Sequence, residues 1–286
     1  MDYLLYIGAL MCIWIIVSVA VNLVIGYTGM MAMGHAAYLG IGAYTAASLN
    51  IFFGVDYFSA MVIAALCSAV VAVLTLLPLL RLQGFYFALA TLGLNFVFFD
   101  LFHNLAPRVE ASEGLYGLKL PAALASADAR FATTLLITVA CILIARHLVG
   151  SPFGRLLRAT RDRPEAVDAV GKNPTACQIV IWGVSGALTG LAGALYAATL
   201  SYIDASLFTS TASIAMLVFV GVGGLASIAG SILGPVLLIA FTEALRFIGL
   251  SSQFIGPVQQ ALYGVLLIVL MIFRRQGLVG KHDFRE

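Results

Sequence analysis

The polar segment at residues 151–174 has the clearest potential for chemistry in this sequence, because the rest of the chain is mostly apolar. Three arginines in it recur at i, i+3 and i+6 and would form one basic face of a helix: Arg155, Arg158 and Arg161. An apolar face follows i, i+3, i+4, i+7 spacing: Phe153, Leu156, Leu157 and Thr160. Such a helix lies along a membrane surface, where its guanidinium groups meet lipid phosphates or a protein partner.

A second, shorter helix is expected directly after the first one. Asp162 and Glu165 have the spacing of a capping box, and Pro164 suits a first helical turn. Gly171 is a natural C-terminal stop. The resulting helix of about eight residues is too short to be stable unless something packs on it. The segment is therefore either an interfacial loop that only follows the positive-inside rule or a docking surface for a cytoplasmic protein.

The composition around this segment predicts an integral membrane protein. Of the 286 residues, 62% are hydrophobic and 10% are charged, whereas soluble domains carry about 25% charged residues. No polar stretch is long enough for a soluble domain, so we predict one all-α membrane domain over residues 1–286, with a cytoplasmic loop at about 150–175. The net charge of +2 does not indicate a nucleic-acid partner.

Apolar runs along the chain predict about eight or nine transmembrane helices. The candidate spans lie at about 3–25, 31–50, 57–80, 83–103, 131–149, 176–200, 209–226, 228–248 and 258–273. Because the N-terminus lacks the positive flank of a signal peptide, the first run is expected to be a permanent span. The Gly-rich runs near 26–42 and 221–234 are expected to be broken or re-entrant, with protein covering their non-helical backbone.

The distribution of Lys and Arg predicts which side of the membrane each loop occupies. With these spans, eleven Lys and Arg fall on one side and four on the other. Because cytoplasmic loops carry the excess of positive charge, the 150–175 loop and the C-terminus are expected in the cytoplasm. The N-terminus and the polar loop at about 104–130 are then expected outside.

Motifs of a self-sufficient enzyme are absent from the sequence. There is no Gly-x-x-x-x-Gly-Lys phosphate loop, no Ser-Asp-His order and no His-Glu-x-x-His pattern. The four cysteines lack paired spacing and are interpreted as small buried hydrophobes: Cys12, Cys67, Cys141 and Cys177. No catalytic residue, metal or cofactor is therefore predicted, and energy for any transport must come from a partner or a gradient.

The short helix resembles the EAA motif of ABC-importer permeases. In that family Glu-Ala-Ala precedes a glycine at the spacing seen here, although Val167 replaces the usual second alanine. The resemblance implies that the helix docks in a groove of an ATPase subunit and passes its movement to the spans. The residues assigned to docking or to support of this loop are Glu165, Ala166, Gly171, Arg155, Arg158 and Arg161.

Further stretches resemble the branched-chain amino acid ABC permease family, particularly its LivM-like half. They run in order from about residue 20 to about residue 240 and include Gly-His-Ala-Ala-Tyr at 34–38, Gln-Gly-Phe-Tyr-Phe-Ala at 83–88, Ser-Pro-Phe-Gly-Arg at 151–155 and Gly-Leu-Ala-Gly-Ala-Leu-Tyr at 190–196. Two stretches depart from the family pattern, Met-Met-Ala-Met at 30–33 and Val-Glu-Ala-Ser-Glu-Gly-Leu at 109–115. Both departures bear on the substrate more than on the fold.

The resemblance implies a set of partners in a bacterial inner membrane. These are a second permease subunit, two cytoplasmic ATP-binding subunits, a periplasmic solute-binding protein, membrane lipid and a branched-chain or other small amino acid. Urea and small amides stay open as substrates. The alternatives are a gradient-driven secondary transporter, which would use the Gly-rich runs as broken helices but finds few embedded carboxylates here, and a scaffold subunit without a transport path.

Polar and small residues inside the spans are candidates for contacting a solute or a neighbouring helix. A small, polar stripe follows i, i+4, i+7, i+11 spacing: Gly84, Ala88, Thr91 and Asn95. We expect Thr91 and Asn95 either to hydrogen-bond other helices or to line a translocation path. His35 is either a buried neutral histidine or a substrate-facing group. Small residues at four-residue spacing within 183–197 predict close packing with another span or with a second permease subunit.

Overall fold

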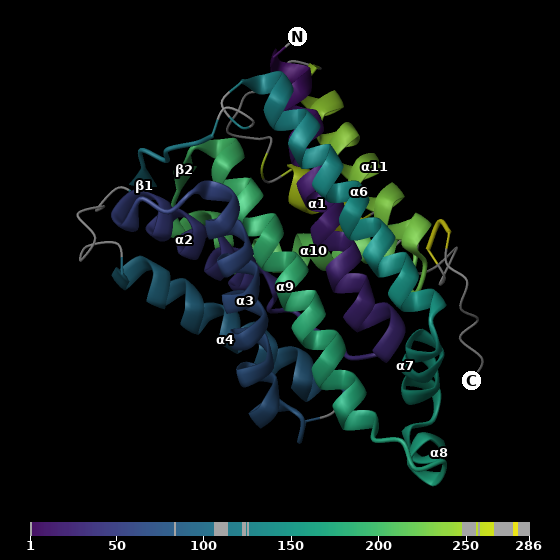
Figure 1. Ribbon diagram of the computed structural model, residues 1–286. Helices are drawn as coiled ribbons and strands as arrows, with labels where there is room; N and C mark the ends of the chain where they lie inside the picture. Colours follow the sequence, from purple (N-terminus) through teal and green to yellow (C-terminus); the bar gives the residue numbers. More distant parts are fainter. Residues whose placement is uncertain are drawn as a thin grey trace.

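The computed structural model describes residues 2–82, 84–105, 114–121, 124, 126–247, 256, 258–265 and 277–279. Within these ranges the chain is helical apart from loops and one pair of two-residue strands (Figure 1). Among the described residues, six helices are long and apolar enough to cross a membrane: α1 (Asp2–Thr28), α2 (His35–Phe53), α3 (Tyr57–Leu79), α4 (Phe85–Leu105), α6 (Ala127–Gly150) and α9 (Pro174–Leu200). The predicted all-α, multi-span membrane fold is confirmed.

The other elements are short or bent. The polar segment forms α7 (Pro152–Asp162) and α8 (Pro164–Ala169). A strand β1 (Leu115–Tyr116) pairs antiparallel with β2 (Tyr202–Ile203), and the 3-10 helix η2 (Ala205–Phe208) follows. The last two long helices, α10 (Ser210–Gly223) and α11 (Ile228–Phe247), are bent by 118° at the break between them.

The described residues do not confirm the predicted count of eight or nine crossings. Over the described residues the structure has six spans, or seven if the bent pair α10 and α11 is one span. The runs at 209–226 and 228–248, predicted as two spans, are the two arms of this bent pair, because the chain turns sharply at residues 224–227 between them. Half of the ninth predicted span, 258–273, lies outside the described residues.

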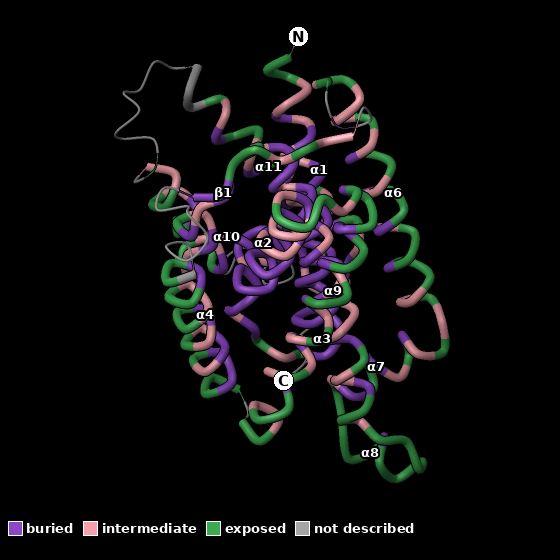
Figure 2. Tube along the Cα trace, turned by 60° about the vertical axis from the view of Figure 1, so that its left-hand side comes forward, coloured by how far each residue is buried: buried purple, intermediate pink, exposed green. Residues whose placement is uncertain are grey.

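Helix α9 is the centre of the bundle and packs against α1, α2 and α3. Small residues make this possible: a Cβ on Gly193 would overlap the carbonyl oxygen of Leu39 on α2, and a Cβ on Gly186 would lie 2.5 Å from the Cβ of Ala72 on α3. Figure 2 shows the buried residues concentrated in α1, α2 and α9, whereas α4 and α6 expose much of their length. The small residues of α9 therefore serve packing within the chain.

The first Gly-rich run is broken, as predicted, and α2 begins at His35 rather than near residue 31. Residues 29–34 are non-helical, and the start of α2 lies beside α9 and the middle of α1, because the His35 ring contacts Ser185, whose hydroxyl donates to the carbonyl of Ala20. Part of this segment packs against α4, since the amide of Met33 donates to Thr91 Oγ1 at 3.0 Å, whereas Gly29 and Met31 are exposed.

Contacts at the two ends of α1 orient the bundle. At its first turn, the Tyr3 hydroxyl donates to Glu243 on α11 at 2.7 Å. At its last turn, Arg161 of α7 donates to the carbonyl of Gly26. Helices α7 and α8 therefore lie at the end of the bundle opposite the N-terminus (Figure 1).

Cysteine packing agrees with the prediction at three of the four positions. Cys12, Cys141 and Cys177 are buried thiols without disulfides. Cys67 is exposed, because it lies on a face of α3 that no other described helix covers. Among the described residues, no cluster of His, Cys, Asp and Glu side chains is suited to hold a metal ion.

Candidate functional site

Helix α7 has the local structure that its sequence predicts. The Ser151 hydroxyl accepts a hydrogen bond from the Gly154 amide at 3.4 Å, and Pro152 occupies the first turn. Leu157 and Thr160 are buried against the bundle. A Cβ on Gly154 would overlap the backbone of Val149, so the close turn from α6 into α7 requires glycine there. The apolar face of α7 therefore fixes it to the end of the bundle.

The three predicted basic residues of α7 have different surroundings. Arg155 is exposed. Arg158 donates to the carbonyls of Gly154 and Val149 at 3.3 and 3.0 Å, so its guanidinium braces the turn between α6 and α7. Arg161 points into the bundle, where it donates to the Gly26 carbonyl, and burial lowers the pKa of its guanidinium. Arg155 is thus the arginine of this helix that is fully available to an outside partner.

Helix α8 projects beyond the bundle and places the EAA-like residues at its tip. Most of α8 is exposed (Figure 2). Glu165 and Ala166 are exposed, and so is Gly171 after the helix. Gly171 has φ +72° and ends the helix as predicted, with the Lys172 amide bonded to the Val167 carbonyl at 3.1 Å. Val167 is 2% exposed and packs the six-residue helix onto its neighbours α7 and α9.

The predicted capping box of α8 is wrong. Helix α7 continues through Asp162, so Arg163 occupies the N-cap position of α8 and makes no capping hydrogen bond through its side chain. Glu165 is therefore not engaged as a capping residue and stays exposed at the surface. The burial of Val167 is what holds this short helix in place.

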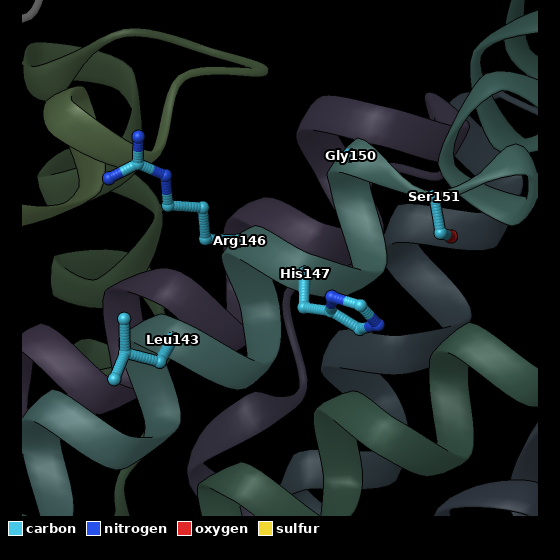
Figure 3. A pocket seen from close by; sticks show the side chains of 5 residues that line it. All are labelled: Leu143, Arg146, His147, Gly150 and Ser151. Atoms are coloured by element: carbon cyan, nitrogen blue, oxygen red, sulfur yellow. The ribbon is translucent and has the colours of Figure 1, made fainter.

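A surface hollow of about 500 Å³ lies at the end of α6, beside the start of α7. Its lining residues are Leu143, Arg146, His147, Gly150 and Ser151. Figure 3 shows that the Arg146 and His147 side chains extend in different directions along the helix instead of converging on one point. The hollow is therefore not arranged as a site for chemistry.

Thr91 and Asn95 lie at a buried polar seam between α4, α10 and the start of α2. Thr91 Oγ1 accepts from the Met33 amide, and Asn95 Oδ1 accepts from the Ser213 hydroxyl of α10 at 3.4 Å. Ser213 Oγ in turn accepts from the Ala36 amide in the first turn of α2 at 3.0 Å. The sequence did not single out Ser213, because it is one of three hydroxyl residues at the start of the apolar run at 210–223, after Ser210 and Thr211.

The His35 side chain has partners outside the Thr91 and Asn95 seam, although its neighbour Ala36 donates to Ser213 there. Its Nε2 atom lies 3.1 Å from the Ser185 hydroxyl of α9, and its ring lies against those of Tyr38 and Trp182. The sequence placed His35 with Thr91 and Asn95 as a candidate for the path. In the structure its ring is surrounded by α9 and aromatic side chains, and its place on a path stays a prediction.

Two of the predicted path residues carry unpaired buried atoms. Among the described residues, the buried side-chain N and O atoms without a hydrogen bond are Ser18 Oγ, His35 Nδ1 and Asn95 Nδ2. A buried donor or acceptor without a partner costs about 1–3 kcal/mol, and such groups in native proteins call for an explanation. Asn95 Nδ2 is therefore a donor at the seam that is open to a further partner.

The structure combines broken apolar spans, a buried polar seam and an exposed short helix at one end of the bundle. These features are typical of a polytopic membrane permease. Residues 3–273 match the family described as the permease component of the branched-chain amino acid transport system. The chain therefore belongs to that family. It is a transport subunit of an ABC system, in which ATP hydrolysis takes place on separate subunits.

Individual relatives agree with this family. The chain is 28% identical to the high-affinity branched-chain amino acid permease protein LivM of Salmonella typhimurium, over 96% of this chain and 69% of that protein. It is 24% identical to a probable LivM of Methanocaldococcus jannaschii, over 93% and 90% of the two chains. It is also 23% identical to the guanosine ABC transporter permease NupQ of Bacillus subtilis, over 90% and 85%. No solved structure matches the chain. None of these relatives favours a gradient-driven transporter.

Proposed function

We propose that this chain, as one membrane domain, carries branched-chain or similarly small amino acids into a bacterial cell. It would pair with a second permease subunit, two cytoplasmic ATP-binding subunits and a periplasmic solute-binding protein in the inner membrane. The observation that carries the coupling part of the proposal is α8, which exposes Glu165 and Ala166 beyond the end of the bundle while Val167 anchors it. The substrate class rests on the LivM relatives, because the guanosine permease shows that this fold serves other solutes.

The proposed mechanism starts at α8 on the cytoplasmic side. Closure of the ATP-binding subunits around ATP moves α8, together with the exposed Arg155 and the braced turn at Arg158. Because ATP binds the closed subunits more tightly than the open ones, it shifts the permease between two arrangements of its spans. The solute then crosses along the seam that contains Thr91 and Asn95.

Asn95→Leu is expected to reduce ATP-driven leucine uptake about tenfold or more, since a lost polar contact to a solute is worth about 1.4 kcal/mol or more. The Asn95 side chain is fully buried, and its Nδ2 atom has no partner in the protein. Uptake of labelled leucine would be measured in membrane vesicles that contain this chain and its partner subunits. The matched control is Phe96→Leu on the exposed face of α4, which should leave uptake unchanged.

Competition in the same vesicles tests the substrate class. Excess unlabelled valine or isoleucine should suppress leucine uptake, and guanosine should not. ATP-dependent uptake of labelled guanosine, with no ATP-dependent uptake of labelled leucine, would refute the amino-acid assignment while leaving the permease assignment intact. If Asn95→Leu takes up leucine at the wild-type rate, Asn95 does not line the translocation path.

A further inference from the structure

The end of α1 lies between α7 and the break of the bent pair α10 and α11. On one side, Arg161 of α7 donates to the Gly26 carbonyl, and a Cβ on Gly29 would lie 3.1 Å from the Arg161 side chain. On the other side, a Cβ on Gly26 would lie 2.6 Å from the amide nitrogen of Ala226 in the break. Gly26 therefore contacts α7 through its carbonyl oxygen, and its α-carbon lies close to the break between α10 and α11.

Asn22, one turn before Gly26, holds the break in place. The Asn22 side chain is fully buried, and its Nδ2 atom donates to the Ser227 carbonyl at 2.9 Å and to the Ser231 hydroxyl at 2.6 Å. Its Oδ1 atom accepts from the Ala226 amide at 3.0 Å. Ala226 has φ +56°, an unusual conformation for a residue with a Cβ. One amide group therefore meets the hydrogen-bonding needs of a turn that lacks helical partners.

The two arms of the bent pair are closely coupled to this break. The backbones of Gly223 and Gly230 approach so closely that a Cβ on Gly230 would lie 2.5 Å from the Gly223 carbonyl oxygen. The chain near its C-terminus also contacts the end of α10, since the Leu278 amide donates to the Val222 carbonyl at 3.0 Å. Helix α10 carries Ser213, which contacts Asn95 at the seam. A change of angle at the break would therefore move one wall of the seam.

We propose that Arg161 and Asn22 are positioning residues that transmit movement of the coupling loop to the break between α10 and α11. This inference rests on the proposed function, because it takes α8 as the site where an ATP-binding subunit acts. The path runs from α8 through α7 to Gly26, then through Asn22 to the break and along α10 to the seam. Such a path requires an element with two arrangements, and the proposal assigns that role to the bent pair.

Hydrogen exchange at the break tests this proposal without knowledge of the solute. The complex with its ATP-binding subunits would be compared in the free state and after trapping with ATP and vanadate. Trapping should speed amide exchange in peptides covering 222–231 about tenfold in the wild type, because the bonds at Asn22 open. Arg161→Ala should remove this acceleration, and Arg161→Lys, which keeps a charged donor, should restore at least part of it. Arg146→Ala, an exposed arginine at the same end of the bundle, should behave as the wild type.

The outcomes separate the relay from the proposed function. If Arg161→Ala still binds the ATP-binding subunits and shows the wild-type acceleration, the relay is refuted. If Asn22→Ala in the same complex also leaves the acceleration intact, the break does not depend on this contact and the relay is refuted as well. If the wild-type chain binds no ATP-binding subunit, the proposed function fails before the relay is reached.

Discussion

Replacing Gly193 by valine is expected to abolish the folded form of this chain. A Cβ at this position would overlap the Leu39 carbonyl oxygen and lie 3.0 Å from the Ala43 amide nitrogen. Both obstacles are backbone atoms of α2, so no side chain can rotate away. Because α9 also packs against α1 and α3, moving it apart from α2 would disrupt the whole centre. We expect destabilisation of about 3 kcal/mol or more.

Size-exclusion chromatography of a fluorescent fusion in mild detergent measures this effect. The Gly193→Val chain should lose the monodisperse peak of the wild type and run as aggregate. Gly93→Val is the matched control, because Gly93 on α4 has open space around its Cβ position. A wild-type peak for Gly193→Val would show that α2 and α9 are not packed backbone to backbone.

Replacing Val167 by aspartate is expected to detach α8 while leaving the spans intact. Val167 is 2% exposed and anchors a helix of six residues, which is too short to be stable alone. A carboxylate cannot stay buried there without a partner, since burying an unpaired charge costs several kcal/mol. That cost shifts the equilibrium between docked and detached α8 by about a hundredfold or more. The detached helix would no longer present Glu165 and Ala166 in a fixed arrangement.

Limited trypsin digestion and ATP-driven uptake report on this variant together. Val167→Asp should be cut faster at Lys172, which follows α8, and uptake should fall about tenfold or more. Val167→Ile keeps the apolar contact and should retain both wild-type properties. Normal uptake by Val167→Asp would mean that α8 does not act as an anchored docking helix.

Local chemistry made much of the loop predictable from the sequence. Ser151 and Gly171 act where their cap and stop signals placed them, because these signals depend on a few neighbouring residues. The predicted capping box is wrong because it, too, depends on only a few neighbouring residues. Asp162 satisfies that local pattern, but α7, with its buried apolar face, continues through this residue. The Gly-rich runs likewise predicted both breaks, although not that two predicted spans are arms of one bent pair.

Contacts between distant segments were not predictable from a single sequence. Asn22 stands in an apolar run, and nothing near it indicates partners about two hundred residues away at the α10–α11 break. The sequence indicates that His35, Thr91 and Asn95 all lie inside the membrane. The His35 ring contacts Ser185 on α9, whereas Asn95 contacts Ser213 on α10. The direction in which a buried polar group points is decided by tertiary packing, and residue type and spacing contain little information about it.

Co-purification of an ATP-binding subunit tests the central claim most directly. The chain would be tagged at its C-terminus, expressed with its neighbouring genes, and isolated in detergent as wild type, Glu165→Lys and Asp128→Lys. Asp128 is an exposed carboxylate at the opposite end of the bundle and serves as the control. We expect the wild type and Asp128→Lys to retain the subunit, and Glu165→Lys to lose about tenfold or more of it, because the reversed charge lies in the docking surface. A folded wild-type chain that brings down no ATP-binding subunit, or equal retention by Glu165→Lys, would contradict the account of α8 as the coupling helix.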